Sequence, residues 1–173
     1  MAADGVRPIG GAHDHATMTQ DDIIALVRVR PGVVLVTAGP ENGAPPVAWG
    51  DTFFSYDPDG LDPADRFLPF ATIVTQDYPG FDTASNLNRA GVFRLNIAVG
   101  RDTFRDLLGY PPAAHPEHAH RIDYRASDEL LPHPVYGTQA WVAILNPGPR
   151  TTAQARALLA HAHSRASERH RQR

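Results

Sequence analysis

Cysteine and lysine are both missing from this chain of 173 residues. Without cysteine, the chain cannot form a disulfide framework, a thiolate nucleophile, or a cysteine-ligated zinc or iron–sulfur site. Without lysine, Schiff-base catalysis and the phosphate-binding lysine of a P-loop are excluded as well. Any chemistry must therefore come from histidine, aspartate, glutamate, arginine, tyrosine or serine side chains.

Long apolar runs are also missing. The longest, such as residues 33–36, have the length of a strand and fall far short of the ~20 residues that a membrane-spanning helix needs. The first residues of the chain lack the apolar stretch of a signal peptide. We therefore expect a soluble, cytoplasmic protein with no membrane partner, and the length suits a single domain.

The short motifs of several common enzyme classes do not occur in the sequence. No Gly-x-Ser-x-Gly elbow surrounds a serine, and no Gly-x-Gly-x-x-Gly follows an expected strand. A nucleic-acid-binding motif is missing too. Neither a hydrolase triad nor a Rossmann domain is indicated.

The sixteen basic residues are all arginine, and they are unevenly distributed. Residues 150–173 hold six arginines and a single acid, Glu168, whereas residues 1–149 hold ten arginines and eighteen acids. An acidic body repels a polyanion, so nucleic acid is disfavoured as a partner. We interpret the basic end as a solvated helix end whose late arginines complement the helix dipole.

Hydrophobic patterns and turn signals predict a single domain at residues 18–166. Residues 1–17 have no periodicity and are predicted to be a disordered extension, and residues 167–173 are predicted to be a basic tail. Strand patterns lie at residues 33–37, 46–56, 70–76, 92–99 and 139–145. The first four are linked too tightly for crossover helices, so neighbouring strands should be antiparallel.

Three helices are expected around these strands. The first begins at the N-cap Thr19, the second lies between Gly100 and Gly109, and the last begins at Thr151 or Thr152.

The segment between the second helix and the strand at 139–145 is expected to contain no strand. Residues 110–121 are predicted to form a loop, because Pro116 argues against a helix there, and residues 127–131 a helical turn. The resulting order, α-β-β-β-β-α-β-α, predicts an α+β fold. It consists of an antiparallel β-sheet of about five strands with helices packed on one face.

Strand alternation indicates where a ligand could bind, because alternate residues of a half-buried strand point to opposite faces. In the strand at 92–99 the apolar residues would face the helices, which leaves Arg94 and Asn96 on the other face. Aromatic walls beside a few directed polar groups are typical of a small-molecule pocket. The predicted ligand-binding residues are Arg94, Asn96, Trp49, Trp141, Thr72 and Tyr78. A plain amphipathic surface or a homodimer contact is the alternative for this face.

Four side chains near this face are candidate catalytic residues. Asp51, within the expected strand at 46–56, could act as a base or as the ion partner of Arg94. His133 and Tyr136 precede the last strand as a candidate acid/base and a proton donor, and Asp77 lies in a Pro-Gly turn that could fold over the pocket. Structural roles for the same residues are the alternative.

Histidines gather in the loop at 110–121. His115, His118 and His120 are spaced closely enough to bind a divalent transition metal, with His133 further along the chain. They do not follow the helical His-Glu-x-x-His pattern, and a flexible loop that titrates near neutral pH is the alternative. We expect no cofactor, with a metal at these histidines as the alternative.

Six motifs occur in order along the domain: PGVV at 31–34, AWGDTFF at 48–54, PFATIV at 69–74, DYPGFD at 77–82, FRLNI at 93–97 and HPVY at 133–136. Together they resemble an uncharacterised family of actinobacterial proteins of unknown function, which implies no reaction. A looser similarity, in the opening helix and in the closing strand, turn and helix, is to the MmcQ/YjbR-like proteins. That resemblance implies an antiparallel sheet against helices and a suggested DNA-binding role, from which the acidic body, the lack of lysine and the insertion at 109–121 depart.

We therefore predict a small-molecule-binding protein that acts on an anionic or carbonyl-bearing ligand. Whether it is an enzyme stays open; if it is one, we expect a cofactor-independent acid/base enzyme of specialised metabolism, of the lyase, isomerase or cyclase type. The alternatives are a histidine-ligated metal-dependent enzyme and a non-enzymatic DNA-binding or interaction module.

Overall fold

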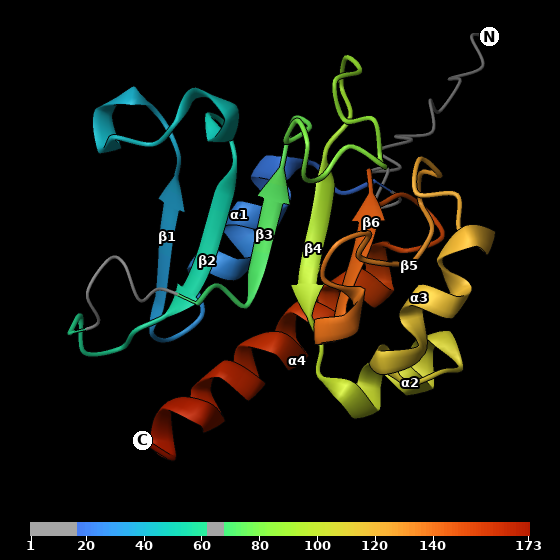
Figure 1. The fold of residues 1–173 in the computed structure, drawn as a ribbon. Helices are drawn as coiled ribbons and strands as arrows, with labels where there is room; N and C mark the ends of the chain where they lie inside the picture. Colours follow the sequence, from blue (N-terminus) through green and yellow to red (C-terminus); the bar gives the residue numbers. More distant parts are fainter. Residues whose placement is uncertain (1–16, 62–67) are drawn as a thin grey trace, which may run out of the picture.

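The computed structural model describes residues 17–61 and 68–173, so residues 1–16 of the predicted extension lie outside the described residues. Its centre is a six-stranded antiparallel sheet with the strand order β1-β2-β3-β4-β6-β5 (Figure 1). The strands are β1 (Val33–Thr37), β2 (Thr52–Tyr56), β3 (Ala71–Val74), β4 (Arg94–Ala98), β5 (Leu131–Pro132) and β6 (Trp141–Leu145). The predicted α+β class is confirmed, and the short β5 is the strand that the sequence did not indicate.

Two helices cover one face of the sheet, which we call the inner face. The helix α1 (Gln20–Arg28) packs on β1, and α4 (Thr152–Arg171) crosses β2 and β4 (Figure 1). The short helices α2 (Arg101–Leu108) and α3 (His115–His118) lie beside β4 and β6 at one end of the sheet (Figure 1). The opposite, outer face carries no helix within the described part of the chain.

The core lies between the inner face and these two helices. The alternation expected in β4 and β6 is confirmed, because Arg94 and Asn96 lie outside the apolar cluster that α1 and α4 share with the residues predicted to face the helices: Leu95, Ile97, Val142 and Ile144. The predicted inner face of the last helix is also buried: Ala155, Leu158, Leu159 and Ala162.

The start of α1 follows the expected capping pattern. The backbone N–H of Asp22 donates to Thr19 Oγ1 over 3.1 Å, and the Asp22 carboxylate accepts from the Thr19 backbone N–H over 2.9 Å. These two bonds form a capping box that satisfies free donors of the first turn. At the other end of the chain, α4 continues through Arg171, so most of the predicted basic tail is helical.

Local predictions fail at three places. Residues 46–48 form a 3₁₀ turn instead of strand, because prolines precede them and Gly50 adopts a φ of 90°. The prediction that Pro116 excludes a helix is wrong: it lies in the first turn of α3, where a missing backbone N–H removes no helical hydrogen bond. The helical turn predicted at 127–131 is wrong as well, because Asp128 has a φ of 54°.

The structure also tests the prediction that no helix crosses a membrane. Across residues 17–61 and 68–173, no helix combines the length and the apolar character that crossing a membrane requires.

Candidate functional site

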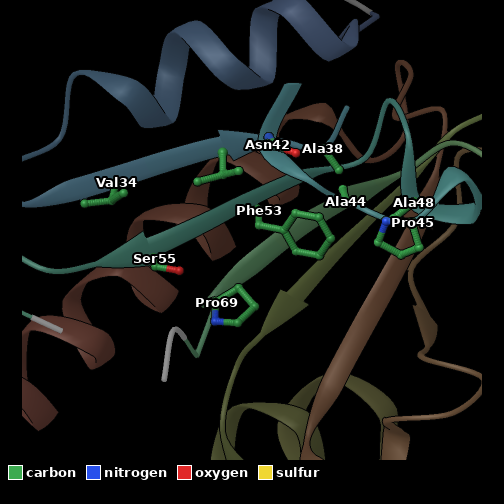
Figure 2. A pocket seen from close by; sticks show the side chains of 10 residues that line it. Val34, Ala38, Asn42, Ala44, Pro45, Ala48, Phe53, Ser55 and Pro69 are labelled. Atoms are coloured by element: carbon green, nitrogen blue, oxygen red, sulfur yellow. The ribbon is translucent and has the colours of Figure 1, made fainter. Parts of the chain in front are cut away.

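A cavity of about 500 Å³ lies on the outer face over β1 and β2, and we call it the β1–β2 cavity (Figure 2). Its lining is mostly apolar and comes from both strands, from the segment between them and from a proline two residues before β3: Val34, Val36, Ala38, Asn42, Ala44, Pro45, Ala48, Phe53, Ser55 and Pro69. Figure 2 shows the Phe53 ring among these side chains. Predicted ligand-binding residues are not among them, so the cavity lies on the same face of the sheet as those residues but over other strands.

The polar atoms of the cavity differ in what they contact. Asn42 is engaged internally, since its Nδ2 donates to the Thr37 carbonyl over 2.9 Å and its Oδ1 accepts from Gly39 N–H over 3.1 Å. Ser55 is only 5 % exposed, and its hydroxyl has no hydrogen bond to the described residues. The Ser55 hydroxyl is therefore available to a ligand in the cavity.

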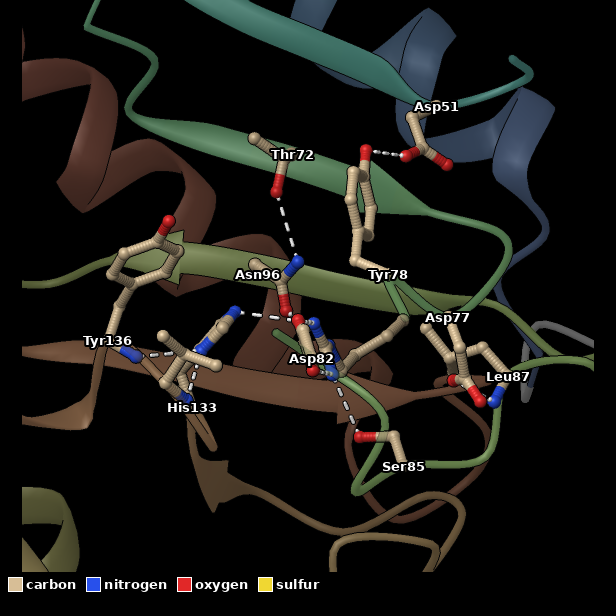
Figure 3. A network of polar contacts seen from close by, with 12 residues as sticks. Asp51, Thr72, Asp77, Tyr78, Asp82, Ser85, Leu87, Asn96, His133 and Tyr136 are labelled. Carbon is tan, nitrogen blue, oxygen red and sulfur yellow. Dashed lines mark hydrogen bonds and ion pairs between the residues drawn. The ribbon is translucent and has the colours of Figure 1, made fainter. Parts of the chain in front are cut away.

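The other half of the outer face, over β3, β4 and β6, holds a buried polar network centred on Arg94 (Figure 3). Arg94 is 0 % exposed. Its guanidinium donates to both oxygens of Asp82, at 3.1 and 2.5 Å, to Ser85 Oγ at 2.8 Å and to Asn96 Oδ1 at 2.8 Å. Asn96 in turn donates to Thr72 Oγ1 over 3.0 Å, which continues the network onto β3.

This arrangement corrects two predictions about Arg94. Its ion partner is Asp82, from the loop between β3 and β4, and not Asp51. Its donors are directed at protein acceptors, so Arg94 does not present a free guanidinium to clamp a ligand anion. Arg94 instead holds that loop against β4, and its hydrogen bond to Asn96 connects it to Thr72 on β3.

His133 closes the network on the β5 side. Its Nδ1 accepts the backbone N–H groups of Val135 and Tyr136, at 3.0 and 2.9 Å. A ring nitrogen that accepts two hydrogen bonds carries no proton, so the neutral ring holds its proton on Nε2. Arg94 Nη2 lies 3.3 Å from Nε2, and because both groups are donors in this tautomer the two side chains are in contact without a hydrogen bond. Burial, and next the positive charge of Arg94, hold the pKa of His133 well below its ordinary value of 6.5.

We expect replacement of His133 by asparagine to flatten the pH dependence of stability. A histidine with a lowered pKa protonates more readily in the unfolded chain, so its contribution is complete above pH 6.5 and is lost as the pH falls below that value. The asparagine Oδ1 can accept the same two backbone bonds but does not titrate. Urea denaturation across this pH range checks the prediction; equal slopes for the two proteins would contradict it.

Asp51 and Tyr78 form a second polar pair on the same face (Figure 3). Asp51 accepts from the Tyr78 hydroxyl and from the backbone N–H and Oγ1 of Thr75, at 2.8 and 3.0 Å. Burial raises the pKa of Asp51 above its ordinary value, although these hydrogen bonds oppose the shift. Burial and the neighbouring Asp51 raise the pKa of Tyr78, so this hydroxyl stays protonated and donates to Asp51.

The remaining predicted residues do not come together at one site. Asp77 accepts the backbone N–H of Leu87 over 2.8 Å, so its carboxylate holds the loop instead of facing a ligand. Tyr136 packs near Trp141 and Phe81, with ring centroids 6.4 and 6.0 Å apart. Trp49 precedes β2 and Trp141 begins β6, which runs antiparallel to β2, so the two tryptophans lie at opposite ends of the sheet and do not wall one site.

The clustered histidines do not come together as ligands. His115 packs on Gly137, where an added Cβ would lie 2.6 Å from the ring, and its Nε2 lies 3.3 Å from the Tyr124 hydroxyl. His118 stacks on Tyr110 with ring centroids 3.9 Å apart. Within the described ranges, no group of three or more histidine or acidic side chains could hold a metal ion. His115 and His118 act as packing residues here, and metal binding by the clustered histidines stays a prediction.

Comparison with known proteins gives a family. A family model, described as a family of unknown function and named DUF6194, matches residues 18–173. The chain belongs to DUF6194. No curated protein matches this DUF6194 member.

One solved structure is similar to the DUF6194 chain. It is the crystal structure of Deinococcus radiodurans protein DR2400, with the family-model domain DUF419. The two chains are 14% identical, the match covers 85% of this chain and 77% of that chain, and the TM-score is 0.47.

Proposed function

We propose that this DUF6194 protein binds a small, largely apolar organic molecule with one carbonyl or anionic group in the β1–β2 cavity. The cavity itself carries the proposal. Its volume of about 500 Å³ lies within the range of roughly 300–1,000 Å³ of small-molecule sites, which combine apolar walls with few polar groups.

Ser55 gives the cavity a directed polar group. Ser55 lines the cavity together with apolar side chains, and its hydroxyl can donate to a ligand oxygen without breaking a hydrogen bond to the described residues. A ligand carbonyl or carboxylate placed there would gain a hydrogen bond, and the ligand body would lie against Phe53 and Val36.

The Arg94 network borders the β1–β2 cavity and holds the neighbouring strands in place. Phe53 pairs with Thr72 across β2 and β3, and Thr72 pairs with Asn96 across β3 and β4. The edge of the cavity is thus continuous with the Arg94 network, which fixes the strands that border it. We assign Arg94 and Asn96 to positioning of the outer face, and Ser55 to ligand contact.

A fluorescent probe tests the proposal directly. The probe is 8-anilinonaphthalene-1-sulfonate, which combines an apolar body with an anionic group and fluoresces more strongly in apolar surroundings. We expect saturable binding that Ala44→Phe weakens at least about tenfold, because the new ring fills the cavity. Ser55→Ala should weaken binding roughly two- to tenfold through loss of one hydrogen bond.

The matched control is Ala113→Phe, which adds the same ring at an exposed position in the 3₁₀ turn Pro112–Ala114, outside the cavity. Its affinity for the probe should equal that of the unchanged protein. Equal binding by Ala44→Phe and Ala113→Phe would show that the probe lies elsewhere and would overturn the proposal.

Further functional statements rest on the sequence and stay predictions. They are the acid/base role of His133, Asp51 and Tyr136 and a place in specialised metabolism. The actinobacterial source, the cytoplasmic location, and the MmcQ/YjbR likeness with its DNA-binding role also stay predictions. Retention on duplex DNA that is lost in high salt and on truncation after residue 165 tests the last of these.

A further inference from the structure

The strand β1 forms one edge of the sheet and has no neighbour beyond it in the strand order. Its sequence, Val-Val-Leu-Val-Thr, contains none of the charges or prolines that usually protect an edge from pairing. Val36 is 41% exposed on this strand. An unprotected apolar edge of this kind is a template for pairing with another strand.

The hydrogen-bond pattern shows which backbone groups of β1 point away from β2. Ala38 N–H donates to Asp51 C=O and Asp57 N–H donates to Gly32 C=O, at the two ends of the β1–β2 register. Because hydrogen-bonded pairs alternate in an antiparallel ladder, Val34 and Val36 also bond to β2. Val33, Leu35 and Thr37 therefore direct their backbone groups outward.

Two of these outward groups are already engaged within the chain. Val33 N–H donates to the Arg30 carbonyl over 3.4 Å, and the Thr37 carbonyl accepts from Asn42 Nδ2 over 2.9 Å. The alternation leaves four outward groups without a partner among the described residues: Val33 C=O, Leu35 N–H, Leu35 C=O and Thr37 N–H.

These four groups are complementary to the same four groups on the β1 strand of a second copy of the chain. In an antiparallel pair centred on Leu35, each Leu35 N–H meets the Leu35 C=O of the other copy, and each Thr37 N–H meets a Val33 C=O. The engaged groups, Val33 N–H and the Thr37 carbonyl, fall opposite each other, so neither is needed. With a two-fold axis at Leu35, each of the four outward groups therefore has a hydrogen-bond partner in the other copy.

Charge at the two ends of β1 agrees with this orientation. Arg28 and Arg30 precede the strand, and the exposed Glu41 follows it in the 3₁₀ turn Pro40–Asn42. Antiparallel pairing brings the basic end of one copy beside the acidic end of the other. The helix α1 lies behind the sheet and inward of β1, so it leaves the edge open (Figure 1).

We propose that the protein forms a two-fold symmetric homodimer through β1, which joins the two sheets into one continuous antiparallel sheet. Four backbone hydrogen bonds between the β1 strands hold the pair, and Val34 of each copy faces Val36 of the other on the outer face. This pairing does not depend on a ligand in the β1–β2 cavity.

The first experiment measures molar mass by light scattering over a wide range of protein concentration. We expect a dimer. Thr37→Pro removes an outward N–H, a position where an edge strand tolerates proline, and should raise the dissociation constant roughly tenfold or more. Thr37→Val is the matched control, because it loses the same side-chain hydroxyl and keeps the N–H. It should remain a dimer.

The second experiment tests the register and takes advantage of the lack of native cysteine. Oxidation of a mixture of Val34→Cys and Val36→Cys should give a cross-linked heterodimer, because residues facing each other in a non-hydrogen-bonded pair have Cα atoms about 4.5 Å apart. Val34→Cys alone should cross-link poorly, since its two copies are diagonal neighbours about 7–8 Å apart.

Three results would overturn the proposal. They are a monomer at every concentration, a dimer that Thr37→Pro leaves as tight as Thr37→Val does, and cross-linking of Val34→Cys alone as efficient as that of the mixture. Circular dichroism melting of each variant shows whether it is folded. If Thr37→Pro does not fold, the cysteine pair decides the question by itself.

Discussion

Replacing Asp82 with alanine is expected to lower the free energy of unfolding by about 3–5 kcal/mol, because the change leaves a buried cation without its anion. Arg94 and Asp82 have side-chain exposures of 1% and 7%, and their closest atoms are 2.5 Å apart. Urea denaturation of the purified variant measures the loss.

Two variants serve as controls for this prediction. Arg125→Ala removes an ion pair of 3.9 Å in which both side chains are well exposed, and should cost less than about 1 kcal/mol. The double variant Asp82→Ala with Arg94→Met should be more stable than Asp82→Ala alone, since no buried charge is then unpaired. If Asp82→Ala lowers the free energy of unfolding no more than Arg125→Ala does, the ion pair with Asp82 does not stabilise buried Arg94, and the prediction is wrong.

Replacing Asp128 with asparagine is expected to destabilise the protein by about 1–2 kcal/mol through the start of α4. The Asp128 carboxylate accepts the backbone N–H groups of Gly148, Arg150 and Thr151, at 2.9, 3.0 and 3.0 Å, and the Thr151 hydroxyl at 2.7 Å. Thr151 itself makes no side-chain cap, so a residue distant in sequence caps the helix. Asparagine tolerates the left-handed backbone at this position, which isolates the effect of the carboxylate.

The effect of Asp128 should depend on pH. Burial raises the pKa of its carboxyl, but hydrogen bonds from Thr151, Arg150 and Gly148 outweigh burial and lower it below the ordinary value of 3.8. A lowered carboxyl pKa stabilises the fold above pH 3.8 and ceases to do so as the pH falls below it. The stability difference between the protein and Asp128→Asn should therefore shrink in acid, whereas the exposed control Asp106→Asn should show little difference at any pH.

The parts of the fold that follow a local pattern could be predicted from the sequence. The period-two pattern of β4 places Arg94 and Asn96 on the face opposite the helices, because side-chain alternation is a property of the strand alone. The capping box at Thr19 and the inner face of α4 likewise depend on residues three or four apart.

The parts that depend on irregular loops could not be predicted. Asp82 reaches Arg94 from an irregular loop, and no repeating sequence pattern predicts the path of such a loop. From the sequence alone, Asp51 was therefore an equally reasonable partner for Arg94. Asp128 caps a helix that begins more than twenty residues later, beyond the reach of any capping rule. The β1–β2 cavity had one signal in the sequence: residues 33–36 are apolar throughout, which indicates that both faces of β1 contact something.

The order of strands in the sheet has a consequence for synthesis of the chain. The first four strands pair with their neighbours in sequence, whereas α4, which crosses β2 and β4, is synthesised after all of them. A ribosome therefore produces the meander β1–β4 before the helix that covers Phe54 and Leu95 exists. Until α4 is synthesised, that nascent sheet exposes an apolar surface that chaperones and proteases can engage, and truncation before α4 should send the product to degradation.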